Sequence, residues 1–87
     1  IPRPPAEIVR IITDPGLADN PSKQENAARL VKYGMDGMTA KDLRTAFAKE
    51  AREQGWNREM YDSKGKLTAY GQRKLRLSRF IRKHNIE

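Results

Sequence analysis

The chain has 87 residues, with 18 Lys and Arg against 11 Asp and Glu and a net charge of +7. A chain of this length forms one domain with a small core. The absence of cysteine excludes disulfides and thiolate metal sites, and no apolar run reaches the ~20 residues of a membrane span. We therefore expect a cytoplasmic domain with no membrane partner, associated with the nucleoid if the organism is a prokaryote.

The positive charge is gathered toward the C-terminus. Residues 1–57 hold nine cations and eight anions, whereas residues 58–87 hold nine cations and three anions. A solubility role would not require the charge to be concentrated in one third of the chain. This asymmetry predicts a polyanionic partner.

The chain opens with Ile1-Pro2-Arg3-Pro4-Pro5 and has no initiator Met. Proline-rich stretches are stiff, extended and poor in packing, so residues 1–5 look like the end of a linker. We expect residues 6–87 to form one helical domain that was cut from a longer protein or is a trimmed product.

The first helix is predicted over residues 5–13, because proline is favoured at a helix start and Ile8, Val9, Ile11 and Ile12 supply apolar bulk. Asp14-Pro15-Gly16 should end it, since proline cannot continue a helix. The second helix is predicted from Ser22 to about Tyr33. Ser22 and Glu25 have the spacing of a capping box, and Gly34 suits a left-handed C-cap.

The third helix is predicted from Thr39, with Asp42 in the capping-box position, to Gln54, with Gly55 as its end. Its apolar stripe is Ala40, Leu43, Phe47 and Ala51, and Glu50 stands at the margin of that stripe.

A sector of the third helix combines cations with small side chains, which suits close approach to a groove where side chains read base edges. The candidate groove contacts are Thr39, Lys41, Arg44, Thr45 and Lys49, with any sequence reading resting on Arg44 and Thr45. An exposed helix with i,i+4 pairs such as Lys49–Glu53 is an equal alternative.

The second and third predicted helices are joined by Gly34-Met35-Asp36-Gly37-Met38. In outline, the stretch from Ala27 to Ala51 is similar to helix-turn-helix units, although its turn is longer than the usual three or four residues. The resemblance implies that the second helix enters the major groove.

Residues 60–67 contain a turn, Asp62-Ser63-Lys64-Gly65, with Asp and Gly at the positions that such turns favour. The residues on each side would pair as a very short hairpin, and the whole would then resemble a winged helix. A plain loop is an equal alternative. If a wing forms, Lys64 and Lys66 would contact the phosphate backbone.

The last helix is predicted from Thr68 to about residue 84, with Tyr70, Leu77, Phe80 and Ile81 on its apolar side. Residues 71–85 include six Lys or Arg and no acid. Like charges at helical spacing repel, and arginine suits bidentate phosphate contacts, which favours an anionic partner over a solvated face. The candidate phosphate contacts are Arg76, Arg79, Arg82 and Lys83 on the opposite side, with Arg73 near the rim.

Two aromatic residues follow the third predicted helix. Trp56 and Tyr61 lie beside Arg58 and would serve to stack single-stranded bases. Alternatively, Trp56 covers a small core.

The sequence has little that suits catalysis, and we predict no enzyme, metal or cofactor. There is one histidine, His84, expected to be exposed, and no set of residues with metal-ligand spacing. Glu50 and Glu53 look like an ordinary surface pair. A small basic ribonuclease with His84 or Tyr61 in acid–base work is the one enzymatic alternative.

The sequence thus predicts a mostly α domain of three to four helices that binds nucleic acid without catalysis. Duplex DNA is favoured over RNA, in a regulator or in the binding module of a longer polypeptide, and a homodimer would be common for such a module. The alternatives are a protein-interaction module that docks its basic helix on an acidic partner, and a ribonuclease, toxin or RNA-binding domain.

Overall fold

The computed structural model describes residues 5–33 and 37–87. Within these residues the chain forms five helices and no sheet. They are α1 (Pro5–Thr13), α2 (Pro15–Ala18), α3 (Pro21–Lys32), α4 (Ala40–Gln54) and α5 (Ala69–Lys83).

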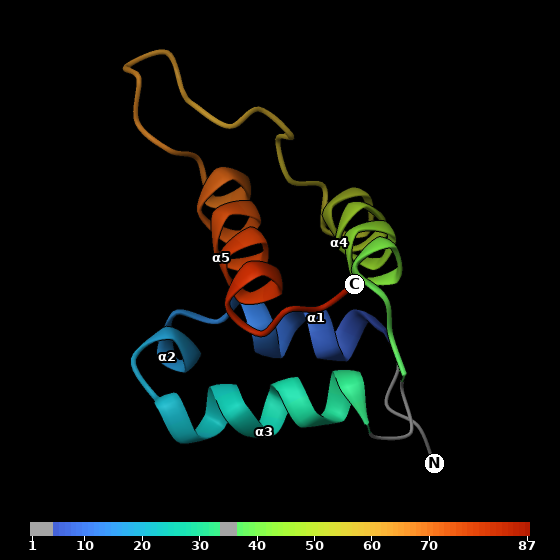
Figure 1. The fold of residues 1–87 in the computed structure, drawn as a ribbon. Coiled ribbons are helices and arrows are strands. Elements are labelled where there is room, and N and C mark those ends of the chain that lie inside the picture. Colours follow the sequence, from blue (N-terminus) through green and yellow to red (C-terminus); the bar gives the residue numbers. More distant parts are fainter. Residues whose placement is uncertain (1–4, 34–36) are drawn as a thin grey trace.

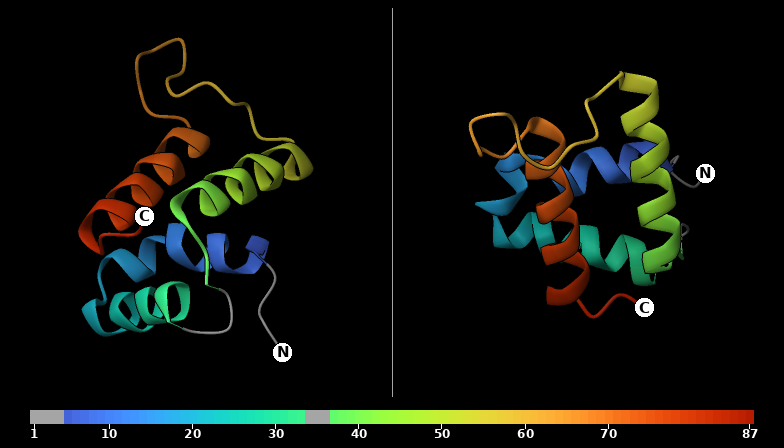
Figure 2. Two further views of the ribbon diagram at one scale, coloured as in Figure 1. Left: turned by 45° about the vertical axis from the view of Figure 1, so that its right-hand side comes forward. Right: turned by 90° about the horizontal axis from the view of Figure 1, so that it is seen from above.

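The helices form two layers, and α1 lies at the boundary between them (Figures 1 and 2). Helices α4 and α5 lie in one layer, and α1, α2 and α3 lie in the other. Helix α1 contacts each of the other four helices, most extensively α4 and α5. The radius of gyration is 12.9 Å, close to the about 12 Å expected for a compact chain of this length.

The core is built from the apolar stripes that the sequence predicts. Phe47 and Phe80 are buried, and Tyr70 is half-buried with its ring stacked 5.4 Å from that of Phe47. The other large core side chains come from all the long helices and from the C-terminal tail: Ile8, Val9, Ile12, Val31, Leu43, Leu77, Ile81 and Ile86.

Helix α1 has the predicted bounds, but the segment after it does more than end a helix. The side chain of Asp14 accepts a hydrogen bond from the backbone N–H of Gly16 at 2.7 Å, and Pro15 begins α2. Proline at the first helical position loses no hydrogen bond, because that N–H has no partner within the helix. The short α2 places Leu17 in the core.

The predicted start of α3 is wrong. Helix α3 begins at Pro21, and its cap is Asn20, whose side chain accepts from the N–H of Lys23 at 3.1 Å. Pro21 presets a helical φ, so the helix starts before Ser22, and the capping box of Ser22 and Glu25 does not form. The predicted C-cap Gly34 lies outside the described residues, as do residues 1–4 of the linker-like start.

Helix α4 begins and ends as predicted. Thr39 Oγ1 accepts from the N–H of Asp42 at 3.2 Å, and Asp42 Oδ2 accepts from the N–H of Thr39 at 3.0 Å. These two bonds hold the pKa of Asp42 below its ordinary value. Gly55 ends the helix with a φ of 69°, the left-handed conformation that glycine adopts without strain.

Helices α3 and α4 do not pack extensively on each other within the described residues: α3 packs on α1 and α2, and α4 packs on α1 and α5. Part of the predicted turn between them, residues 34–36, is outside the described residues. The resemblance to a helix-turn-helix is therefore not confirmed.

Residues 56–68 form a loop that projects beyond the ends of α4 and α5 (Figure 1). A single antiparallel bridge joins Tyr61 to Leu67, and the N–H of Asp62 donates to the carbonyl of Lys66 at 2.8 Å. The described residues contain the predicted turn but no strand on either side of it, so a wing is not shown.

Helix α5 runs from Ala69 to Lys83 behind the predicted cap Thr68, whose Oγ1 accepts from the N–H of Gly71 at 3.0 Å. The chain then returns toward the start of α4, where the N–H of Ala40 donates to the carbonyl of Glu87 at 2.7 Å. Ile86 is buried on the way. The C-terminal tail thus fixes the end of α5 against the rest of the domain.

Candidate nucleic-acid interface

Two of the α5 arginines lie on the flank of the helix, against the rest of the protein. Arg76 is half-buried, and its Nη1 donates to the carbonyl of Thr13 at 3.2 Å. Arg73 is half-buried as well, with its guanidinium carbon 4.7 Å from the centroid of the Trp56 ring. The prediction that Arg76 points away from the core is therefore wrong, because α1 packs beside α5 on that flank.

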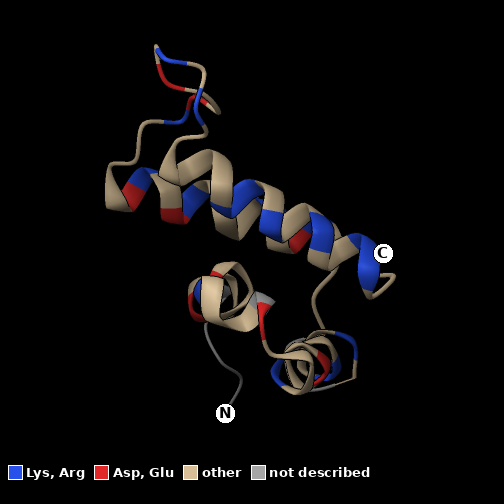
Figure 3. Cartoon of the chain, turned by 90° about the vertical axis from the view of Figure 1, so that its left-hand side faces the viewer, with Lys and Arg blue, Asp and Glu red and all other residues tan. Residues whose placement is uncertain are grey.

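The remaining α5 cations of the predicted set are exposed: Arg79, Arg82 and Lys83. Lys83 Nζ donates to Gln24 Oε1 of α3 at 2.8 Å. Arg79 has no hydrogen bond or ion pair within the described part of the chain. Figure 3, which views this side of the molecule, shows Lys and Arg recurring along α5.

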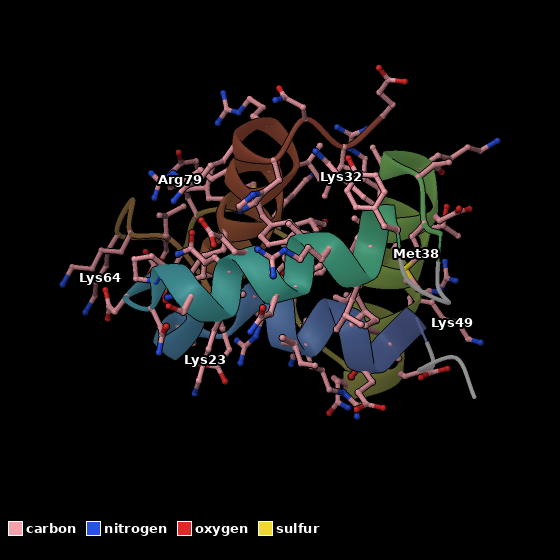
Figure 4. The ribbon with its side chains drawn as sticks, turned by 60° about the horizontal axis from the view of Figure 1, so that its bottom comes forward. Lys23, Lys32, Met38, Lys49, Lys64 and Arg79 are labelled. Carbon is pink, nitrogen blue, oxygen red and sulfur yellow. The ribbon has the colours of Figure 1, made fainter. Side chains whose placement is uncertain are left out.

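The loop cations share this side with α5. Figure 4 shows Lys64 and Arg79 toward the same side of the molecule and Lys49 of α4 toward the other. The backbone N–H groups of Lys64 and Lys66 both donate to Asp62 Oδ1, at 2.8 and 3.0 Å, which fixes the turn while the two side chains stay exposed. We call the exposed cations Lys64, Lys66, Arg79, Arg82 and Lys83 the α5-side basic surface.

The candidate groove contacts on α4 are exposed as a set: Thr39, Lys41, Arg44, Thr45 and Lys49. Lys49 Nζ lies 4.0 Å from Glu53 Oε1, as the alternative of an exposed helix with i,i+4 pairs expects. Lys49 and Arg79 point toward different sides, so the structure separates Lys49 of the groove set from Arg79 of the α5-side basic surface.

The aromatic candidates are in different environments. Trp56 is half-buried, packs against the core and lies 6.2 Å from Phe47 between ring centroids, as expected if it covers the core. Arg73 covers its ring. Tyr61 is 56% exposed at the loop, and Tyr33, which was not a candidate, is 83% exposed at the end of α3.

Glu50 was predicted at the margin of the apolar stripe of α4 and in a surface pair with Glu53, but it is buried, with 1% of its surface exposed. Its Oε1 accepts from Arg10 Nε of α1 at 2.8 Å and from Gln54 Nε2 at 3.1 Å. These hydrogen bonds, led by that from Arg10, lower the pKa of Glu50, although burial opposes the shift. Its spacing from Leu43 and Phe47 is the one sequence signal that could have placed it in the core.

His84 is half-buried rather than exposed. Its ring centroid lies 4.6 Å from that of Phe80, and its Nε2 is buried with no hydrogen-bond partner among the described residues. Desolvation and the charges of Lys83 and Lys32 lower its pKa. The imidazole is therefore a packing group at the end of α5.

Two features are absent from the described residues. No group of three or more His, Cys, Asp or Glu side chains is placed to hold a metal ion, and no helix is long and apolar enough to cross a membrane. Comparison of the chain with protein-family models, curated proteins and solved structures finds no match.

Proposed function

We propose that this chain is a non-catalytic nucleic-acid-binding domain that contacts phosphate through the α5-side basic surface. Duplex DNA is the favoured partner, and the domain would act in the cytoplasm as a regulator or as the binding module of a longer polypeptide. The observation that carries the proposal is the composition of α5. Its residues 69–83 include six cations and no acid, and four of these cations are exposed: Lys74, Arg79, Arg82 and Lys83.

The structure divides the predicted phosphate contacts into two groups. Arg79, Arg82 and Lys83 are exposed, which leaves their side chains open to a phosphate partner. Arg73 and Arg76 are engaged with Trp56 and Thr13, so they hold the flank of α5 in place. We assign the phosphate-dependent affinity to the exposed group together with Lys64 and Lys66.

Base reading by α4 is a separate part of the proposal. If α3 and α4 act as a helix-turn-helix, the groove contacts would be Thr39, Lys41, Arg44, Thr45 and Lys49, with Arg44 and Thr45 reading base edges. Replacing Arg44 would then relax sequence preference without a large change in the salt dependence of binding.

The α5 surface fits a nucleic acid better than an acidic protein groove. A helix that docks in a protein groove uses apolar anchors at i, i+3 and i+4 spacing. Among the cations of α5, the large apolar side chain in register with Arg79 and Arg82 is Leu75, which is half-buried. The ribonuclease alternative depends on His84 or Tyr61, and the packing of the His84 ring against Phe80 favours a structural role.

The test is a fluorescence-anisotropy titration of the chain against duplex DNA, single-stranded DNA, structured RNA and polyglutamate at several salt concentrations. The proposal predicts binding that favours the duplex and weakens steeply with salt. Preference for polyglutamate would support the acidic-partner alternative. Degradation of the RNA that disappears in His84→Ala would support the ribonuclease.

A further inference from the structure

A pocket of about 260 Å³ lies beneath the flank of α5, where that helix meets α1, α2 and α3. Its lining residues are Ile12, Leu17, Gln24, Arg76, Arg79, Phe80 and Lys83. The pocket therefore combines apolar side chains from three helices with polar groups from α3 and α5.

The floor of the pocket is apolar. Ile12, Leu17 and Phe80 belong to the core and are each at most 5% exposed. A solvated phosphate contact needs no such floor, since duplex phosphates are met by charged side chains at an open surface. The floor indicates a ligand with an apolar body.

The rim of the pocket is cationic. Arg76, Arg79 and Lys83 converge on it, and no carboxylate lines it. A neutral apolar ligand would remove water from these cations without giving them a partner, which is costly. An anion on the ligand would offset that cost through charge-assisted hydrogen bonds.

Two of the three cations are already held in place. Arg76 donates to the carbonyl of Thr13 at 3.2 Å, and Lys83 donates to Gln24 Oε1 at 2.8 Å. Gln24 is itself braced, because its Nε2 donates to the carbonyl of Leu17 at 2.9 Å. A preorganised rim binds with less loss of side-chain entropy than a mobile one.

We propose that this pocket binds a small organic anion, with one carboxylate, sulfonate or phosphate on Arg79 and its neighbours and an apolar body on Ile12, Leu17 and Phe80. The pocket is smaller than the roughly 300–1,000 Å³ typical of sites for drug-sized molecules. It therefore suits a body of one or two rings or a short acyl chain. The proposal does not depend on nucleic-acid binding.

The probe is naphthalene-1-sulfonate, which joins a sulfonate to a two-ring apolar body, measured by fluorescence titration of the folded chain. Naphthalene-1-sulfonamide has the same apolar body without the charge. We expect saturable binding of the sulfonate and at least tenfold weaker binding of the neutral compound, since a hydrogen bond to a charged group contributes about tenfold or more.

Arg79→Gln is the test variant, because Arg79 is exposed and lines the pocket without holding another element. We expect it to weaken binding of the sulfonate by about tenfold. Arg52→Gln is the matched control: Arg52 is exposed on α4, outside the pocket, and the change in net charge is the same. It should alter the affinity by less than about twofold, as a charge distant from the site is largely screened.

The location is checked by amide chemical-shift mapping, with circular dichroism showing that each variant is folded. Shifts confined to the neighbourhood of Leu17, Gln24 and Phe80 support the site. Equal affinity for the neutral compound, equal affinity in Arg79→Gln, or shifts confined to other helices would overturn it. If the sulfonate binds the pocket and no nucleic acid binds the chain, this site is upheld and the proposed function fails.

Discussion

Arg10 on α1 and Glu50 on α4 form an ion pair, with Nε and Oε1 2.8 Å apart. The two residues are 40 positions apart in the sequence, so the pair joins the two helices. The pair is asymmetric, because the Arg10 side chain is 60% exposed and that of Glu50 is 1% exposed. A buried carboxylate is tolerated when it is paired and hydrogen-bonded. Arg10 therefore compensates for the burial of Glu50.

This asymmetry predicts how the stability depends on pH. The folded-state pKa of Glu50 lies below its ordinary value of 4.5, so the unfolded chain binds the proton more readily. The resulting stabilisation is present above that value and is lost as the pH falls through the folded-state pKa. Removing the hydrogen bond in Arg10→Gln leaves burial to raise the pKa, so acid unfolding should begin at a higher pH.

The measurement is far-UV circular dichroism from neutral to acidic pH. The control is Lys49→Gln, which removes one partner of a surface pair whose side chains are 69% and 56% exposed. Such pairs contribute little to stability, so the control should follow the wild-type profile. Identical profiles for both variants would contradict the role of Arg10.

The assignment of Asn20 as the cap of α3 predicts a difference between two neighbouring substitutions. Asn20→Ala leaves the N–H of Lys23 without its acceptor and should lower the free energy of unfolding by about 1 kcal/mol. Ser22→Ala should change it little, since no capping box forms at Ser22. Urea unfolding measures both variants. A larger loss of unfolding free energy for Ser22→Ala than for Asn20→Ala would mean that Ser22, and not Asn20, caps the helix.

Replacing Gly71 by alanine should lower the stability of the fold, although the same change within a helix usually raises it. Alanine is usually the better helix former by about 1 kcal/mol. A Cβ at Gly71, however, would collide with the backbone oxygen of Met60 and crowd Leu67. We expect Gly71→Ala to destabilise the fold by about 1–3 kcal/mol, as overpacking does. Thermal unfolding measures this, with Gln72→Ala at the exposed neighbour as the control; a stabilised Gly71→Ala would show that residues 60–67 do not rest on α5.

The lowered pKa of His84 should give the stability a second, smaller dependence on pH. Its pKa lies below the ordinary 6.5 because the ring is desolvated and faces Lys83 and Lys32, with Glu25 opposing the shift. The unfolded chain therefore gains the proton first, and stability falls as the pH drops from 6.5 through the folded-state pKa. Titration of the ring by NMR should give a midpoint below 6.5, and a midpoint above it would mean that the ring is not packed on Phe80.

The sequence predicts a helix well when residues a few positions away determine its ends and its apolar stripe. Thr39, Asp42 and Gly55 determine the ends of α4 through neighbours within a few residues, and the stripe from Leu43 to Ala51 faces the core wherever the core lies. The same holds for α1 and for α5 behind Thr68. The start of α3 differs from the prediction because the sequence offers two cap residues, Asn20 and Ser22, and Pro21 favours the earlier one.

The features that the sequence could not give depend on which element packs beside a residue. The pairing of Glu50 with Arg10 and the contact of Arg76 with Thr13 both require knowing that α1 lies against α4 and α5. Helical periodicity places Arg76 at the edge of the apolar stripe, four residues before Phe80, but it does not say that Thr13 is within reach. The separation of Lys49 from Arg79 likewise follows from helix arrangement alone.

The most direct measurement of the central proposal compares the salt dependence of duplex DNA binding in two charge-matched double variants. Arg79→Gln with Arg82→Gln removes two exposed cations of the α5-side basic surface, and Lys23→Gln with Arg52→Gln removes two exposed cations of α3 and α4. The account predicts that the log–log salt slope becomes shallower by about two in the first variant, because each lost phosphate contact changes it by about 0.9. It predicts the wild-type slope in the second. Equal slopes in the two variants, or no duplex binding by the wild-type chain at low salt, would contradict it.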